Sequence, residues 1–273
     1  MTYPPHLLPS SERIRGYLIH TLAHMPISVY DSIDSTNTEA RRLAESRVSL
    51  PYLVVAHAQT AGKGRLGRSF YSPAGSGLYM TLALELLKDS EEYSRVTPAA
   101  AVAVCHAIER VCDRRADIKW VNDLYLNGKK ICGILTEAVF MGDKTCVLVG
   151  IGVNITTKEF PEGMRNPAGA VLADTDAPVD LSLLCAEITQ NLLANLSAER
   201  AEACLRDYRA RLMSVGKRVV CSHNFAPDGT PDPHASTAGI LLGVDNDYGL
   251  ILQTEDGEIE VLRGGEISVT LLG

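Results

Sequence analysis

The sequence predicts an α+β fold, in which helices cover a mixed, mostly antiparallel sheet and a small β-barrel follows at the C-terminal end. Apolar runs of strand length recur between residues 27 and 153, with helical patterns among them. Asn127-Gly128 separates two of these runs, which is typical of a tight hairpin. After residue 214 the pattern changes to short alternating strands with closely spaced turn residues.

The first part of the chain predicts two short helices and two strands. Thr36 and Glu39 have the spacing of a capping box, which places the start of the second helix there. The expected order is a helix within 10–24, a strand over 27–32, a helix through Glu45 and a buried strand over 53–58. A single helix before residue 27 is too little for a helix-turn-helix domain, which needs about three.

The middle of the chain predicts the centre of the sheet and its helical cover. Pro98 suits the first helical position, so a helix is expected from Thr97 to Arg115. The other expected elements are strands over 78–86, 118–121 and 124–126, an antiparallel pair over 129–140 and 145–153, and helices over 181–196 and 198–212.

A change of composition at residues 214–217 predicts a boundary between a main domain, 1–214, and a barrel domain, 215–273. Turn residues then recur at short intervals, as in a small barrel. They are Asp228-Gly229, Asp247 to Gly249, Asp256-Gly257 and Gly264-Gly265.

Composition excludes several classes of protein. The chain has 273 residues and a formal charge of -7, which is unfavourable for general nucleic-acid binding. Its seven cysteines form no CxxC pair and suit reduced thiols, and its histidines show no metal-ligand spacing. No apolar run approaches the roughly 18 residues of a membrane span, and the start lacks a signal-peptide pattern. We expect a cytoplasmic protein that does not interact with membranes.

A glycine-rich stretch, QTAGKGRLGR over residues 59–68, follows the buried strand directly. Gly62, Gly64 and Gly67 allow close backbone approach, and the cations among them can neutralise phosphate or carboxylate oxygens. The spacing is neither that of a Walker loop nor that of a dinucleotide fingerprint. The stretch therefore predicts an anion site, with a flexible, solvated basic turn as the alternative.

Two further blocks carry chemical groups. In KWVNDLYLNGKKICG, Asn122 and Asp123 can hold Mg²⁺ and phosphates, while Lys130 can neutralise a reacting carboxylate. The alternative is a surface aspartate, a core tryptophan and solvated lysines. At the end of a strand, Gly150 and Gly152 leave space for a flat ligand on the sheet.

In order and spacing, these blocks resemble the signature of the biotin protein ligases. The matching segments are Ser35-Thr36-Asn37, residues 59–68, Lys119 to Leu124, Lys130 to Leu135, Gly150 to Asn154 and Gly264 to Ser268. The resemblance runs from about residue 27 to the C-terminus. It implies a catalytic domain with the class II synthetase-like fold of biotin and lipoate ligases, and a C-terminal barrel that is SH3-like.

The resemblance also implies a two-step reaction. Biotin and MgATP give biotinyl-5′-adenylate and pyrophosphate, and a lysine of a biotin carboxyl carrier protein then attacks the adenylate. Lys130 and Arg65 would be the catalytic residues. Mg²⁺ would be held mostly through ATP, with Asp123 as its protein ligand.

The resemblance implies binding roles for further residues. Hydrogen bonds to the biotin head group would come from Ser35, Thr36, Asn37 and Gln59. The rest of the biotin site would be formed by Lys63, Gly64, Arg65, Lys130, Gly133, Leu135, Gly150 and Gly152. ATP would be bound by Arg65, Arg68, Phe70, Asn122, Asp123, Lys130 and Asn154.

Three positions depart from the usual family pattern. Lys63 stands where arginine is commoner, Val121 where proline is usual, and Phe70 where an aromatic residue, often tryptophan, would stack on adenine. None of these departures removes a charged catalytic group, so they bear on ATP affinity more than on reaction type.

Two other functions are open alternatives: a lipoate or octanoate ligase of the same superfamily, and a biotin-responsive transcriptional regulator. Only 26 residues precede Ile27, so we expect a ligase of the single-function type, without repressor activity and without a nucleic-acid partner. A homodimer through a sheet edge is compatible with this fold.

Overall fold

The computed structural model describes residues 3–87, 93–141, 144–163, 166–173, 175–222, 235–263 and 267–271. The helices are α1 (Ser11–Tyr17), α2 (Thr36–Glu45), α3 (Tyr93–Cys112), α4 (Leu181–Asn195) and α5 (Ala201–Arg211), with short 3-10 turns at Pro5–Leu7, His20–Leu22 and Ala198–Arg200. The strands of the first sheet are β1 (Ile27–Tyr30), β2 (Tyr52–Ala56), β3 (Gly77–Leu87), β4 (Asp117–Lys119), β5 (Asp123–Leu126), β6 (Lys129–Met141) and β7 (Lys144–Asn154). The strands of the second are β8 (Arg218–Ser222), β9 (Ser236–Val244), β10 (Leu250–Thr254), β11 (Ile259–Leu262) and β12 (Ser268–Leu271).

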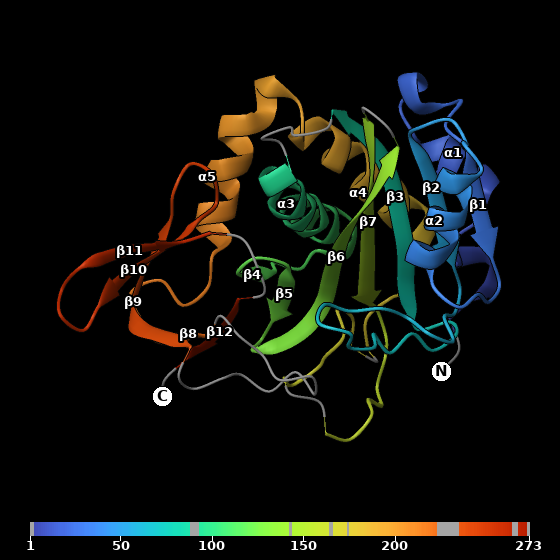
Figure 1. Cartoon of the computed structure of the whole chain (residues 1–273). Coiled ribbons are helices and arrows are strands. Elements are labelled where there is room, and N and C mark those ends of the chain that lie inside the picture. Colours follow the sequence, from blue (N-terminus) through green and yellow to red (C-terminus); the bar gives the residue numbers. More distant parts are fainter. Residues whose placement is uncertain are drawn as a thin grey trace.

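The first sheet has seven strands in the order β1-β2-β3-β7-β6-β5-β4 (Figure 1). Only β1 and β2 pair in parallel, and every other neighbouring pair is antiparallel. Asn127 and Gly128, both with positive φ, turn the chain from β5 into β6. The prediction of a mixed, mostly antiparallel sheet is confirmed.

Alternate residues of β7 enter two separate cores, one on each face of the sheet. Val147, Val149 and Ile151 pack in the larger core with residues of α3 and α4. Cys146 and Leu148 pack on the opposite face with residues of α2. By the two-residue period of a strand, the glycines at 150 and 152 belong to the α2 face.

One expected helix start is wrong, and one expected cap does not form, although α2 begins at Thr36 as predicted. Pro98 lies inside α3, which begins at Tyr93. Val96 is fully buried and Tyr93 packs on the core, so tertiary contacts stabilise the extra turn before Pro98.

The capping box expected at α2 does not form, because Ser35 is the N-cap and its side chain makes no capping hydrogen bond. The Thr36 N–H instead donates to Oε1 of Gln59 at 2.8 Å, and Glu39 accepts from Tyr30.

The second sheet has five antiparallel strands in the order β11-β10-β9-β8-β12. Asp245 to Gly249 joins β9 to β10, and Gly257 has the positive φ of a tight turn before β11. The expected turns at Asp228-Gly229 and Gly264-Gly265 lie outside the described residues. Figure 1 shows this sheet, in orange and red, beyond β4 and β5, with α5 leading to it.

The two sheets are joined by contacts near β4. Nε1 of Trp120, just after β4, donates to the carbonyl of Tyr248 at 2.8 Å. The Met213 N–H donates to the carbonyl of Ile118 at 2.9 Å. The second sheet is therefore held directly against the segment that carries Asn122 and Asp123.

Candidate active site

A cavity of about 820 Å³ lies on the first sheet and is covered by the glycine-rich loop, which we define as residues 62–70. All the residues assigned from the sequence to biotin or ATP binding line it. They are Ser35, Thr36, Asn37, Gln59, Lys63, Gly64, Arg65, Arg68, Phe70, Asn122, Asp123, Lys130, Gly133, Leu135, Gly150, Gly152 and Asn154. The fold thus brings together residues that are up to 119 positions apart, from Ser35 to Asn154.

The glycine-rich loop is a tight hairpin. Phe70 donates its N–H to Gly62 O at 2.8 Å, and Gly64 donates its N–H to Arg68 O at 2.7 Å. Leu66 and Gly67 form its tip with positive φ values of 61° and 69°. The N–H groups of Gly64 and Phe70 are thus used inside the hairpin and are not available to an anion.

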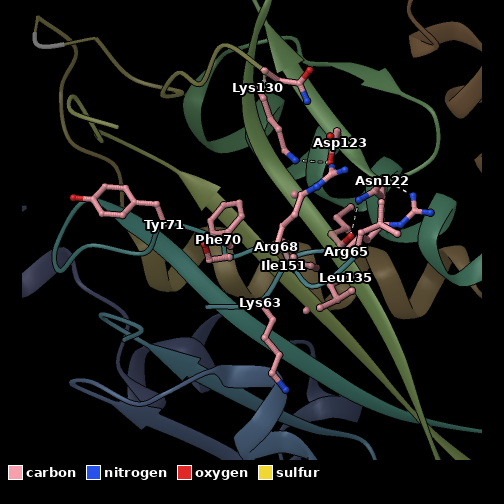
Figure 2. Close-up of a pocket in the computed structure, with 18 of the residues that line it drawn as sticks. Lys63, Arg65, Arg68, Phe70, Tyr71, Asn122, Asp123, Lys130, Leu135 and Ile151 are labelled. Atoms are coloured by element: carbon pink, nitrogen blue, oxygen red, sulfur yellow. Dashed lines mark hydrogen bonds and ion pairs between the residues drawn. The ribbon is translucent and has the colours of Figure 1, made fainter. Parts of the chain in front are cut away.

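Charged side chains gather at one end of the cavity (Figure 2). Lys130 Nζ lies 2.7 Å from Oδ1 of Asp123, and both side chains are mostly buried. Arg65 Nη1 donates to Oδ1 of Asn122 at 3.1 Å, which ties the loop to the start of β5. With Arg68, this end holds three cations and one carboxylate, so it favours an anionic ligand.

Hydrogen-bonding groups of α2 gather at the other end. Oε1 of Gln59 accepts from both the N–H and the hydroxyl of Thr36, at 2.8 and 3.1 Å. Asn37 Oδ1 accepts from the buried Thr81 hydroxyl at 2.6 Å, and its Nδ2 donates to Glu137 at 2.7 Å. Because the Thr36 hydroxyl donates to Gln59, its oxygen can accept from a ligand N–H.

The two strand glycines are covered by side chains. A Cβ on Gly150 would lie 2.1 Å from Oδ1 of Asn37, and one on Gly152 would lie 2.5 Å from the Phe70 ring. Phe70 also packs edge-on against Tyr79, with centroids 6.4 Å apart. The space expected above Gly152 for a flat ligand therefore holds the Phe70 ring.

Asn154 anchors an irregular segment of the cavity wall. Its Nδ2 donates to Gly169 O at 3.1 Å, and its carbonyl accepts from Val171 N at 2.9 Å. Lys130 binds the same segment through its backbone, donating to Pro167 O at 2.8 Å and accepting from Gly169 N at 2.9 Å. Asn154 thus holds the chain that fixes the backbone of Lys130.

Other lining residues were missed from the sequence. They include Tyr71, Phe160, Asn166, Ala168, Ile267 and Val269. Tyr71 and Phe160 form an edge-to-face pair at 6.5 Å. These residues come from irregular segments and from the second sheet, so no local spacing signalled them. Lys63, by contrast, was assigned to biotin, but it is exposed and its side chain points away from the Arg65 and Lys130 cluster (Figure 2).

The described part of the cavity offers few side chains that could bind a metal ion or act as a nucleophile. Within the described ranges, no group of three His, Cys, Asp or Glu side chains could hold a metal ion. Asp123 and Asn122 offer a carboxylate and an amide, which is the kind of set that Mg²⁺ uses when substrate phosphates complete its shell. Burial raises the pKa of the Cys132 thiol well above its ordinary value, so this thiol is no candidate nucleophile.

The described residues include no helix of the length and apolarity needed to cross a membrane.

Comparison with known proteins agrees with this arrangement. The model of the biotin/lipoate A/B protein ligase family matches residues 29–154. The bifunctional ligase/repressor BirA of Bacillus spizizenii is 33% identical over 83% of this chain and 69% of its own length. A biotin--[acetyl-CoA-carboxylase] ligase of Paracoccus denitrificans is 32% identical over 86% of this chain and 96% of its own.

Solved structures show the same fold. The biotin protein ligase of Aquifex aeolicus in complex with biotin and ATP has a TM-score of 0.72 and 28% identity, covering 90% of this chain and 99% of its own. The biotin protein ligase of Leishmania major in complex with biotin has a TM-score of 0.59 and 25% identity, covering 87% and 98%. The chain belongs to the biotin/lipoate protein ligase family, in its biotin protein ligase branch.

Proposed function

We propose that this chain is the ligase that attaches biotin to the lysine of a biotin carboxyl carrier protein. Biotin and ATP react to give biotinyl-5′-adenylate and pyrophosphate. The lysine amine of the carrier then attacks the acyl carbon, and AMP leaves. One observation carries the proposal: a single cavity has hydrogen-bonding groups at one end and a cation cluster at the other.

The hydrogen-bonding end suits a cyclic urea. Thr36 can accept from a urea N–H, and Gln59 Nε2 can donate to the urea carbonyl. The dithiolane ring of lipoate has neither group, so it would leave these polar atoms unpaired, at a cost of about 1–3 kcal/mol for each. This contrast favours biotin over lipoate or octanoate within the family.

The cationic end suits the activation step. The carboxylate of biotin and the α-phosphate of ATP repel each other, and their negative charge must be neutralised while the carboxylate oxygen attacks phosphorus. Lys130 and Arg65 stand where both groups would meet, and Arg68 adds charge from the loop. The hairpin covers the cavity and would protect the reactive mixed anhydride from water.

Mg²⁺ fits this end of the cavity. Asp123 and Asn122 would hold it together with the ATP phosphates, where the ion would supply charge neutralisation. Lys130 would then exchange its contact with Asp123 for contacts with the substrate carboxylate and the α-phosphate.

We place the protein in the cytoplasm, where ATP is available, because its seven cysteines are all free thiols. We further propose that it binds no DNA, since its formal charge is -7. The described residues before β1 support this, because Arg13 pairs with Asp180 and the Ser10 N–H donates to Ser182, which docks α1 on α4. A mobility-shift titration with and without biotin tests the regulator alternative.

The division into domains 1–214 and 215–273 is part of the proposal. The two sheets use separate stretches of chain, which supports it. The residues Ile267 and Val269 also line the cavity, so the second domain would complete the nucleotide end rather than act alone.

The decisive experiment mixes the purified chain with biotin, MgATP and a biotin carboxyl carrier domain. We expect biotin-dependent pyrophosphate release, and biotin on the acceptor lysine but not on a carrier whose acceptor lysine is arginine. Lipoate and octanoate are tested in parallel. Absence of both pyrophosphate release and transfer with biotin, or faster release with lipoate, would contradict the proposal.

A further inference from the structure

We propose that Ser72 is a positioning residue for the biotin head group, an inference that rests on the proposed function. Ser72 is 4% exposed and follows the glycine-rich loop, separated from it only by Tyr71. It does not line the cavity, and it acts through Gln59, which does.

The hydroxyl of Ser72 joins Gln59 to the base of the loop. It accepts from Nε2 of Gln59 at 2.8 Å and donates to the carbonyl of Phe70 at 3.0 Å. The backbones of Gln59 and Ser72 are also bonded, since Gln59 N donates to Ser72 O at 3.1 Å. The carbonyl of Phe70 can only accept, so the single hydroxyl proton is used there and the oxygen must accept from Gln59.

The carboxamide of Gln59 is therefore fixed at both ends. Its Oε1 faces the Thr36 N–H, which can only donate, and its Nε2 faces Ser72. A flipped amide would set two donors against each other at Thr36. In the fixed orientation, one N–H of Nε2 is bonded to Ser72, and the second would donate to a ligand in the cavity that Gln59 lines.

Space around the hydroxyl is as restricted as its bonding. A Cβ on Gly62 would lie 2.7 Å from Oγ of Ser72 and 3.0 Å from Nε2 of Gln59. Gly62 thus permits the close approach on which this contact depends. Through Ser72, the Gln59 amide that would hold the urea carbonyl is linked by hydrogen bonds to the base of the loop at Phe70.

The test compares Ser72→Ala with Ser72→Thr, which keeps the hydroxyl, and with Ser76→Ala as a matched control. The Ser76 hydroxyl donates to the carbonyl of Pro73 and accepts from the hydroxyl of Thr157. Steady-state pyrophosphate release is measured with biotin and with 2-thiobiotin, whose thiocarbonyl is a poorer acceptor.

We expect Ser72→Ala to raise KM for biotin about tenfold and to change kcat less than about threefold, because the partly buried amide donor of Gln59 loses its partner. Its preference for biotin over 2-thiobiotin should fall by a similar factor. Ser72→Thr and Ser76→Ala should show the same preference as the parent. An unchanged preference in a folded Ser72→Ala protein would overturn the inference, and so would a fall in kcat alone. If Ser72→Ala does not fold, loss of the preference in Ser72→Thr overturns it, and a preserved preference supports it.

Failure of the proposed function would look different, because the parent itself would then release no pyrophosphate. In that case, exchange of the Gln59 side-chain amide protons is followed by NMR. Protection that is present in the parent and lost in Ser72→Ala supports the positioning role. Equal exchange in the two proteins overturns it.

Discussion

Lys130 forms an ion pair with Asp123 inside the cavity. Asp123 lies 2.7 Å away, and the backbone of Lys130 is bonded on both sides to the segment from Pro167 to Gly169. The ammonium group is therefore placed precisely enough to meet a substrate carboxylate with little rearrangement of the chain. An anionic ligand would compete with Asp123 for it.

We expect Lys130→Ala to slow adenylate formation by about 100-fold or more, since one preorganised charge is lost at the reacting atoms. The backbone bonds of residue 130 remain, so the fold should persist. Pyrophosphate release and thermal unfolding are measured together. Lys129→Ala, which changes the exposed neighbour, is the control, and equal activity in the two variants would show that the reacting lysine is another one.

The glycine-rich loop is an element that is held by its own hairpin and by contacts across the cavity. One anchor among these contacts is the bond from Arg65 to Asn122. Rigid strands below the loop carry the remaining groups, so the loop is the part best suited to move when a ligand enters.

Arg65→Gly removes this anchor and one cation. We expect the variant to release biotinyl adenylate into solution, because the loop closes less firmly over it. The measurement is biotin incorporated into a bystander protein rich in lysine, with the parent assayed beside it. Retention of the adenylate equal to that of the parent would exclude this role.

Gly150 shows how closely β7 and α2 approach. An alanine there would place its Cβ 2.1 Å from Oδ1 of Asn37, inside a buried network. We expect Gly150→Ala to lower the free energy of unfolding by about 1–3 kcal/mol and to weaken biotin binding. Denaturant unfolding is compared with Gly16→Ala, where no heavy atom lies within 4 Å. Similar stabilities for the two variants would contradict the packing argument.

The contact between α3 and α5 should depend on pH. Burial lowers the pKa of His106 below 6.5, and Asp207, 3.3 Å away, opposes this shift only in part. The unfolded chain thus binds a proton first as pH falls, so the free energy of unfolding decreases from about pH 7 downward through the lowered pKa. We expect His106→Gln to flatten this slope in urea unfolding between about pH 7.5 and 5.5. The exposed His24→Gln should keep it, and equal slopes in the two variants would contradict the assignment.

Much of the fold and of the candidate site could be predicted from the sequence, for reasons that differ between elements. Strands β6 and β7 were predictable because Asn127-Gly128 fixes the turn before β6 and apolar runs mark the two buried strands. The start of α3 was not, because its first turn is stabilised by contacts of Val96 and Tyr93 that lie outside any local pattern. The cavity residues were found through family motifs. Phe160 and Val269 were missed because only the tertiary fold brings them there.

As a whole, the molecule is two sheets that share one site. The indole of Trp120 reaches from the end of β4 to the Tyr248 carbonyl, while Ile267 and Val269 close the cavity from the other sheet. A homodimer through a sheet edge stays a prediction. Because the second sheet helps to form the cavity, the loss of contacts at the Trp120 junction should weaken nucleotide binding.

Trp120→Phe keeps the apolar ring but removes the hydrogen bond to Tyr248. We expect a loss of about 1 kcal/mol in the free energy of unfolding and a raised KM for ATP, with KM for biotin nearly unchanged. The two KM values and a urea titration are the measurements. A raised KM for biotin alone would mean that the junction serves the other end of the cavity.

The burial of all seven thiols has a practical consequence. Burial raises the pKa of Cys105 to about 12 and that of Cys112 to about 11, so neither reacts readily with maleimides at neutral pH. A cysteine introduced at the exposed Ser69 position would then be the preferred point of attachment for a fluorophore. Its emission would follow loop closure in real time as vitamin and nucleotide are added.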